Sequence, residues 1–268
     1  MTVRVGVFGA GGRMGAAVCQ AVTEDPALAL VAAVDPHHAG IDLRQVTRVD
    51  SNLHVSSNAE SFASHDVQVA VDFTHLDAAR ENLAWCASHG VHAVVGTTGF
   101  TDEDFETIRA QFTSSNCVIA PNFAIGAVLM MHFSALAAPW FETAEIIELH
   151  HDAKVDAPSG TAMLTAERIA EASDRWAPDP TTTEVVEGAR GGRSPGGIPI
   201  HSVRLRGLVA HQEVLFGTTA QSLSIRHDSY DRSSFMPGVL LAVKAVADRP
   251  GLTVGLDPLL GIGGQVSS

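Results

Sequence analysis

The first regular structure of the chain is expected in V-R-V-G-V-F-G-A-G-G-R-M-G, residues Val3 to Gly15. Its first six residues form the short apolar run of a buried strand, and a glycine-rich turn follows at once. Apolar residues at helical spacing come next, and a second apolar run, Leu30 to Val34, ends at Asp35. A strand, a glycine-rich turn, a helix and a strand ending in an acid form a βαβ unit of Rossmann type. We therefore predict dinucleotide binding by this part of the chain.

The glycines of this turn are spaced G-x-x-G-x-x-G, at Gly9, Gly12 and Gly15. The usual fingerprint is G-x-G-x-x-G, and Gly11 partly fills the difference. A glycine run by itself is weak evidence, so the prediction depends on the strand before it and the helix after it.

Two residues bear on the choice between the nicotinamide cofactors. Asp35 is placed to hydrogen-bond ribose hydroxyls, which favours NAD. Arg13 lies in the glycine-rich loop and could instead meet a 2′-phosphate, with His37 and His38 as helpers. An exposed loop is the favoured interpretation of the two histidines.

Three further predicted strands end in short polar or glycine-rich segments. Phe73-Thr74 follows the strand Val67–Asp72, Gly96 to Gly99 follows Val91–Val95, and Ala120 to Phe123 follows Asn116–Ile119. Each segment could be an ordinary turn. Ligands of open parallel sheets bind at the carboxyl ends of the strands, so three such segments in succession indicate the rim of a cofactor cleft.

The pattern changes after Gly126 and returns near residue 235. Helices are expected at Ala127–Ala138 and Thr161–Ala172, and strands at Glu145–Leu149, Ile198–Arg206, Val209–Phe216 and Gln221–Arg226. We predict an α/β fold: a Rossmann-type doubly wound parallel sheet with a second α+β substrate domain on a mixed, mostly antiparallel sheet. Residues 1–125 and 235–268 form the first domain, because the apolar helix Pro237–Ala247 has no partner of its own. Residues 126–234 form the second, which binds substrate and carries the subunit contacts.

The segment Gly188 to Gly197, G-A-R-G-G-R-S-P-G-G, is basic and rich in glycine. We interpret it as a flexible loop, either one that closes over an anionic ligand or a plain mobile connection.

The most unusual stretch is E-L-H-H-D-A-K-V-D-A-P-S-G-T-A, residues Glu148 to Ala162. It places His150, His151 and Lys154 where a predicted strand runs into a loop. The run Pro158 to Thr161 then opens a helix, with proline in its first turn. The N–H groups of a first turn bind anions, so this stretch combines titratable groups, a cation and a carboxylate site.

Lysine is rare in this chain: Lys154 and Lys244 are the only two, and every other basic residue is arginine. Lysine can release a proton, whereas arginine effectively cannot. We therefore predict a proton-transfer role for Lys154. The alternative is that His150, His151 and Lys154 lie in an ordinary solvated loop, and the helix start at Pro158 to Thr161 disfavours this alternative.

Composition narrows the class of protein. The 268 residues carry a formal net charge of −13, which argues against nucleic acid or an anionic membrane as a partner. Three scattered cysteines indicate neither a disulfide framework nor a metal site. No apolar run reaches membrane length. We expect a cytoplasmic enzyme whose anionic ligand is met by local positive charge.

The chain resembles the dihydrodipicolinate reductase (4-hydroxy-tetrahydrodipicolinate reductase) family over nearly its whole length. The match rests on Gly9–Gly15, Asp72–Thr74, Gly96–Gly99, Ala120–Gly126, Glu148–Ala162, Ile200–Arg204 and Val209–Glu213. The His-His motif is highly specific to that family, whereas the glycine loop is not. Ala210 stands where such proteins usually carry glycine, which puts only the local hairpin in doubt.

The resemblance implies NADH- or NADPH-dependent reduction of 4-hydroxy-tetrahydrodipicolinate in the diaminopimelate and lysine pathway, by a homotetramer. His150 would be the proton donor and acceptor, His151 a substrate contact and Lys154 the proton donor. Ser159, Gly160 and Thr161 would hold a substrate carboxylate. The cofactor residues implied are Gly9, Ala10, Gly11, Gly12, Arg13, Met14, Phe73, Gly96, Thr97, Thr98, Ala120, Pro121, Asn122 and Phe123. No metal is implied.

Two alternatives share the Rossmann half. One is another nicotinamide-dependent reductase of a small amino or imino acid, such as an aspartate dehydrogenase, which would not need the His150–Lys154 and Ser159–Thr161 arrangement. The other is a dinucleotide sensor without turnover, which would leave Lys154 unexplained.

Overall fold

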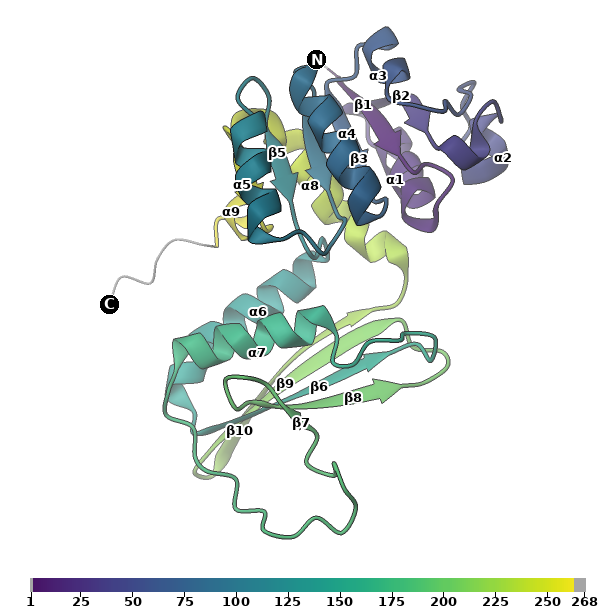
Figure 1. Cartoon of the computed structure of the whole chain (residues 1–268). Coiled ribbons are helices and arrows are strands. Elements are labelled where there is room, and N and C mark those ends of the chain that lie inside the picture. The colour runs from purple at the N-terminus through teal and green to yellow at the C-terminus, as the bar shows by residue number, and fades with distance from the viewer. Residues whose placement is uncertain (1, 263–268) are drawn as a thin grey trace. The chain divides into compact units, whose positions relative to one another are not determined.

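The computed structural model describes residues 2–262, and it divides the chain into two compact units (Figure 1). Unit 1 combines the segment up to Phe123 with the segment from Phe235, and unit 2 is Ala124–Ser234. Residues 1 and 263–268 lie outside the described residues, so the last part of the predicted range 235–268 does as well. The assignment of the units to cofactor and substrate stays a prediction.

Unit 1 is built on one parallel sheet of six strands in the order β11-β5-β4-β3-β1-β2. The strands are β1 (Val3–Phe8), β2 (Leu28–Val34), β3 (Val69–Asp72), β4 (His92–Val95), β5 (Cys117–Ile119) and β11 (Leu252–Val254). β3 is buried at every residue, as expected of a central strand with helices on both faces. The chain order reverses at β1, which has β2 on one side and β3 on the other. The Rossmann-type prediction is confirmed.

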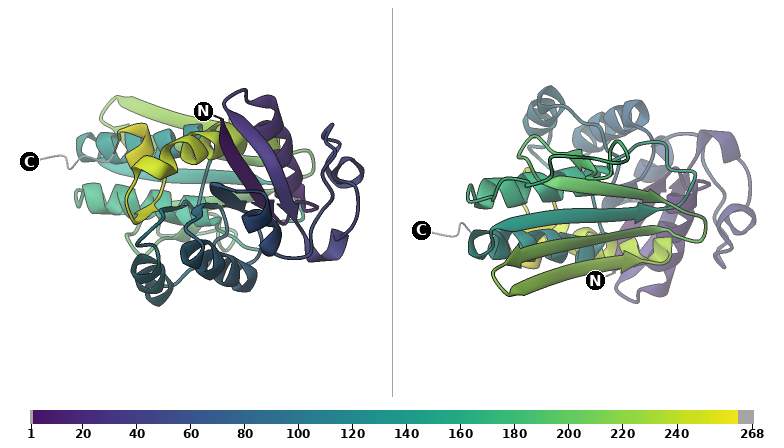
Figure 2. Two further views of the ribbon diagram at one scale, coloured as in Figure 1. Left: turned by 90° about the horizontal axis from the view of Figure 1, so that it is seen from above. Right: turned by 90° about the horizontal axis from the view of Figure 1, so that it is seen from below.

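Helices cover both faces of this sheet. α1 (Arg13–Glu24) and α8 (Met236–Ala245) contact each other, and α4 (Leu76–Ser88) contacts α5 (Asp102–Gln111), with the two pairs on opposite faces (Figures 1 and 2). The sequence gives no signal for the short helices α2 (Leu43–Thr47) and α3 (Glu60–Ser64), which are too brief for a helical period to show. The short helix α9 is Asp257–Leu260.

Local capping explains where several helices begin. α5 starts with a capping box, in which the Thr101 hydroxyl accepts from the Asp104 N–H and the Asp104 carboxylate accepts from the Thr101 N–H. Ser159 caps the helix that follows the His-His motif, accepting from the Ala162 N–H. That helix begins at Gly160, so the prediction that Pro158 lies in its first turn is wrong, since Pro158 precedes the cap.

Unit 2 is a mixed five-stranded sheet in the order β10-β9-β6-β8-β7. β6 and β8 are parallel, and the other neighbouring pairs are antiparallel. The strands are β6 (Thr143–His150), β7 (Gly192–Arg193), β8 (Pro199–Arg204), β9 (Ala210–Thr218) and β10 (Gln221–Ser229). Ala210 starts an ordinary strand, so the doubt about the hairpin is removed.

Two helices cover one face of the second sheet. α6 (Ile125–Ala137) and α7 (Gly160–Ala172) pack together, and α7 shares a core with β6, β8 and β9 that includes Ile146, Ala166 and Ile200. Among the described residues no helix covers the opposite face (Figure 2).

The glycine-rich segment Gly188–Gly197 is more ordered than predicted. Its middle forms β7, which pairs with β8. Arg190 contacts Glu145 at 2.6 Å, and Arg190 and Arg193 both pair with Asp179. The prediction of a flexible loop is therefore wrong at β7, because backbone pairing and ion pairs hold it to the sheet.

Candidate active site

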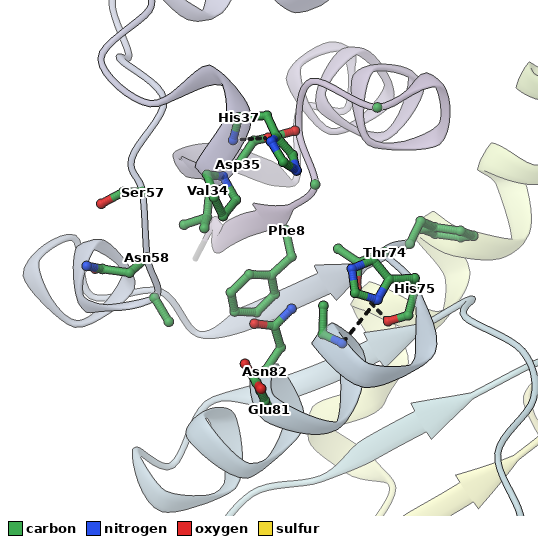
Figure 3. A pocket seen from close by; sticks show the side chains of 16 residues that line it. Phe8, Val34, Asp35, His37, Ser57, Asn58, Thr74, His75, Glu81 and Asn82 are labelled. Atoms are coloured by element: carbon green, nitrogen blue, oxygen red, sulfur yellow. Dashed lines mark hydrogen bonds between the residues drawn. The ribbon is translucent and has the colours of Figure 1, made fainter.

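A pocket of about 550 Å³ opens in unit 1 where the strand order reverses. This is the position at which open parallel sheets bind their ligands. Figure 3 shows Phe8 near its centre, with Val34 at the end of β2 and Asp35 directly after it on one side, and Asn82 from α4 on the other. The lining residues are Phe8, Gly9, Gly12, Val34, Asp35, Pro36, His37, Ser57, Asn58, Ala59, Phe73, Thr74, His75, Ala78, Glu81 and Asn82.

Backbone geometry makes the glycine-rich turn possible. Gly9 has a φ of +65°, a conformation that favours glycine. A Cβ on Gly15 would lie 2.0 Å from the carbonyl oxygen of Gly9, so α1 can approach β1 only with glycine there. Glycines in a dinucleotide fingerprint serve these two purposes.

Asp35 ties the second strand to this turn. Its Oδ2 accepts from the Gly11 N–H at 3.0 Å and its Oδ1 from the His37 N–H at 3.0 Å. The carboxylate is therefore fixed at the pocket wall, where a ribose hydroxyl can reach it.

The two histidines after Asp35 differ from each other. His37 is exposed and lines the pocket. His38 is only half-exposed, because its ring lies where a Cβ on Gly11 would be and its Nδ1 is 3.2 Å from Asp35 Oδ1. The exposed-loop interpretation is wrong for His38.

A buried carboxylate organises the ends of β3 and β4. Asp72 accepts from the Thr74 hydroxyl at 2.6 Å and from the Asn82 side chain at 2.7 Å. Thr97, which follows β4, donates to the Thr74 carbonyl at 3.1 Å. These bonds hold the predicted segments after the two strands in one arrangement.

Aromatic packing extends the same edge towards β5. The rings of Phe73 and Phe123 lie 5.6 Å apart, and a Cβ on Gly96 would overlap the Phe73 ring at 2.0 Å. The segments Phe73-Thr74, Gly96–Thr98 and Ala120–Phe123 thus follow neighbouring parallel strands at the same edge of the sheet.

The His-His motif lies at the end of β6 in unit 2. His150 is half-buried, and its Nδ1 is 2.5 Å from Oε2 of Glu148, a carboxylate with no exposed surface. Arg204 at the end of β8 forms a two-point contact with the same carboxylate, at 2.8 and 2.9 Å. His151 is exposed.

The loop between β6 and α7 carries the lysine. Lys154 Nζ lies 2.8 Å from both carboxylate oxygens of Asp156. The ammonium group of Lys154 lowers the pKa of Asp156 below its usual value. This contact holds Lys154 within its own loop.

α7 presents its first turn beside this loop. The first N–H groups of a helix lack acceptors within the helix, and Gly160 is the first residue of α7, directly after the Ser159 cap. A Cβ on Gly160 would meet no atom within 4 Å, so the turn is open on that side. A carboxylate can therefore approach the backbone here.

Two models of one protein family match nearly the whole chain. Residues 3–123 match the dihydrodipicolinate reductase N-terminus and residues 126–260 the C-terminus. The chain belongs to the dihydrodipicolinate reductase family. It is 51% identical to the 4-hydroxy-tetrahydrodipicolinate reductase of Mycolicibacterium vanbaalenii, covering 96% of this chain and 99% of that protein. Identity to the Cutibacterium acnes protein of that name is 52%, over 97% and 99%.

A solved structure of the family is also similar. Dihydrodipicolinate reductase from Paenisporosarcina sp. TG-14, with dipicolinate bound, superposes with a TM-score of 0.84 at 42% identity, covering 96% of this chain and 99% of that one. Membership of the dihydrodipicolinate reductase family excludes the alternative of an aspartate dehydrogenase.

Several pocket and motif residues were not predicted as site residues. Ser57, Asn58 and Glu81 come from a loop and a helix that give no local signal. Glu148 does give a signal in the sequence. Strict alternation along β6 places it on the same face as Ala144 and Ile146, where an apolar residue is expected, so a charged residue there is unusual. Within residues 2–262, no group of three or more His, Cys, Asp or Glu side chains could hold a metal ion.

Acid is expected to weaken unit 2 through Glu148. Burial raises the pKa of this carboxyl, but hydrogen bonds from His150 and Arg204 outweigh burial and hold the pKa at about 2. The lowered pKa of Glu148 stabilises the folded state by about 3 kcal/mol at pH values above the ordinary pKa of 4.5. This contribution is lost as the pH falls from 4.5 through the folded-state pKa of about 2. Urea unfolding from pH 6 to 2 should therefore show a steeper loss of unfolding free energy in the parent than in Glu148→Gln. Parallel curves for the two proteins would contradict this assignment.

Proposed function

We propose that the chain catalyses the NADH- or NADPH-dependent reduction of 4-hydroxy-tetrahydrodipicolinate to tetrahydrodipicolinate, a step in diaminopimelate and lysine biosynthesis. The ring gains one hydride and one proton, and the 4-hydroxyl group leaves as water. The observation that carries this proposal is identity of 51 to 52% to proteins of that name across nearly the full length. The His150–Lys154 loop and the Ser159–Thr161 helix start supply groups that a ring dicarboxylate requires.

The pocket at the end of β1 suits the cofactor. The reduced nicotinamide supplies the hydride when it is bound. Asp35 would accept hydrogen bonds from a ribose, and the N–H groups of the glycine-rich turn and the first turn of α1 would face the pyrophosphate. The residues proposed to bind are Gly9 to Met14, Asp35, Phe73, Gly96 to Thr98 and Ala120 to Phe123.

The groups at the end of β6 suit the substrate. Two ring carboxylates disfavour the approach of a hydride, so they must first be neutralised. We propose that the N–H groups of Gly160 and Thr161, with Ser159, hold one carboxylate, and that His151 and Lys154 contact the substrate. The relative from Paenisporosarcina sp. TG-14 was solved with dipicolinate, a ring dicarboxylate of this kind.

Proton movement is proposed for two side chains. His150 exchanges a proton through its Nε2, since its Nδ1 is engaged by Glu148. Lys154 delivers a proton from its ammonium group to the ring position next to the one reduced. Asp156 holds that ammonium in the loop that follows the two histidines until substrate arrives.

Loss of reduced-nicotinamide absorbance tests this function directly. The substrate is generated in the cuvette from pyruvate and aspartate semialdehyde, and the purified chain is added last. Substrate-dependent oxidation of the cofactor supports the proposal. Cofactor binding with no turnover supports the alternative of a dinucleotide sensor and contradicts the proposed reductase.

We expect both cofactors to be used. Asp35 favours NADH, whereas Arg13, exposed at the start of α1, tolerates the extra phosphate of NADPH. The kcat/KM values should lie within roughly tenfold of each other, which is about 1.4 kcal/mol. Steady-state kinetics with each cofactor measures the ratio, and a preference beyond about a thousandfold would refute this assignment of the loop.

We also propose a homotetramer in the cytoplasm. The sheet face of unit 2 without a helix is a poor free surface, and Leu215 and Leu223 on its strands are more than a third exposed. Light scattering at micromolar concentration should give four times the mass of one chain, and a monomer would count against it. In the part of the chain that the structure describes, no helix is long and apolar enough to cross a membrane.

A further inference from the structure

Glu148 occupies a position where a charged residue is unexpected. Alternate residues of β6 face the core of unit 2, and on that face Ala144 and Ile146 are 5% and 0% exposed. Glu148 is the next residue on the same face and is also 0% exposed. A buried carboxylate is tolerated only when partners satisfy it, so its contacts indicate what it holds in place.

Those contacts come from three separate segments. Oε1 accepts from the Ser159 N–H at 3.2 Å and from Arg204 at 2.8 Å. Oε2 accepts from Arg204 at 2.9 Å and is 2.5 Å from His150 Nδ1. One carboxylate therefore connects the histidine at the end of β6, the arginine at the end of β8 and the residue that caps α7.

The direction of the His150 hydrogen bond follows from the charge of Glu148. Burial raises the pKa of this carboxyl, but the hydrogen bonds of His150 and Arg204 lower it to about 2, so at neutral pH it is ionised and can only accept. The proton in the contact must then lie on Nδ1 of His150. The second ring nitrogen, Nε2, is left to exchange a proton with a substrate.

We propose that Glu148 is a positioning residue for the reaction, which holds His150 in the tautomer protonated at Nδ1 and, through Ser159, keeps the carboxylate-binding start of α7 in place beside that ring. The inference rests on the proposed reductase function. It differs from a purely structural role, in which Glu148 would do no more than neutralise Arg204.

A glutamine in place of Glu148 separates these roles. Oε1 of the carboxylate faces two fixed donors, the Ser159 N–H and Arg204 Nη2. Oε2 faces one fixed donor, Arg204 Nη1, and His150 Nδ1, which can change from donor to acceptor. The amide oxygen of glutamine therefore takes the Oε1 side, and the amide NH₂ takes the Oε2 side, where it loses the Arg204 Nη1 contact and faces His150 Nδ1. His150 can adapt only by moving its proton to Nε2, which is the wrong tautomer for catalysis.

The chain contains a matched control on the same strand. Glu145 also contacts one arginine and one histidine, Arg190 at 2.6 Å and His201 at 2.7 Å. It lies on the opposite face of β6 from Glu148, outside the His150–Thr161 stretch. Glu145→Gln therefore removes a comparable set of contacts without touching the proposed site.

The kinetic experiment compares single-turnover hydride transfer and KM in the parent, Glu148→Gln and Glu145→Gln. Glu148→Gln should lose roughly 10² to 10⁴ in rate, with KM for the dicarboxylate within about fivefold. Glu145→Gln should stay within about threefold of the parent in both. Glu148→Asp, which keeps an ionised acceptor, should recover at least tenfold over Glu148→Gln. A folded Glu148→Gln with a rate within fivefold of the parent would overturn the proposal.

A second measurement does not depend on how any Glu148 variant folds. The ¹⁵N chemical shifts of the His150 ring, assigned by comparison with His150→Gln, report the tautomer of the parent enzyme. The proposal requires a proton on Nδ1 at neutral pH, and an Nε2-protonated ring would overturn it. If the parent fails to turn over substrate at all, the proposed function fails, while the ring assignment is still decided by these spectra.

Discussion

Lys154→Arg is expected to slow hydride transfer in a single turnover by roughly 10² to 10⁴, the loss typical of a missing general acid. Arginine keeps the positive charge and binds carboxylates well, so substrate affinity should remain nearly normal. It cannot give up a proton near neutral pH, so the proton that Lys154 delivers has no source. The measurement is rapid mixing of the cofactor complex with saturating substrate.

The other lysine of the chain provides the control. Lys244 on α8 is paired with Asp25 at 2.5 Å, as Lys154 is paired with Asp156. Lys244→Arg makes the same chemical change away from the proposed site and should leave the rate unchanged. A Lys154→Arg rate within about fivefold of the parent would remove lysine as the acid and leave it as a charge clamp.

Variants of the two histidines are expected to affect different quantities, turnover for His150 and substrate affinity for His151. His150→Ala is expected to lose turnover to a similar extent as Lys154→Arg, whereas exposed His151 should mainly support substrate affinity. Cofactor affinity should stay within about threefold in all three variants, because the proposed dinucleotide residues follow different strands.

Gly15→Ala is expected to cost about 1 to 3 kcal/mol of stability and to weaken cofactor binding at least tenfold. The added Cβ would lie 2.0 Å from the Gly9 carbonyl oxygen and 2.9 Å from the Ala10 Cα, and these are backbone atoms. Backbone cannot rotate away as a side chain can, so α1 must shift from β1, as in an overpacked core. The glycine-rich turn, which carries the proposed cofactor contacts, moves with it.

Thermal unfolding and cofactor titration of Gly15→Ala measure the two effects. Gly192→Ala is the matched control, because a Cβ there would meet no atom within 4 Å. The control should match the parent in both measurements. If Gly15→Ala also matched it, α1 would not depend on close approach to β1.

Much of the architecture was predictable because it depends on neighbours in sequence. The apolar run before Gly9 gave β1 at its observed bounds, and the acid after Val34 marked the end of β2. Glycine spacing, helical periodicity and short capping sequences act over a few residues. The same local character let the His150–Lys154 stretch stand out.

Where local signals were weak, prediction failed. The segment Gly188–Gly197 reads as a loop, yet Asp179 and Glu145 hold its two arginines and β8 pairs with its centre. His38 reads as exposed, yet its ring occupies space that exists only because residue 11 is glycine.

By itself the sequence determined most of the longer helices and strands, their order, and the residues proposed to carry chemistry. Only the tertiary structure placed β11 beside β5 and brought Arg204 to Glu148 across 56 residues of sequence. Periodicity reports which face of an element is apolar, but not which distant segment covers it. The partners of a buried charge are chosen by packing in three dimensions, and they decide that Glu148 is an ionised acceptor facing His150 rather than a misplaced core residue.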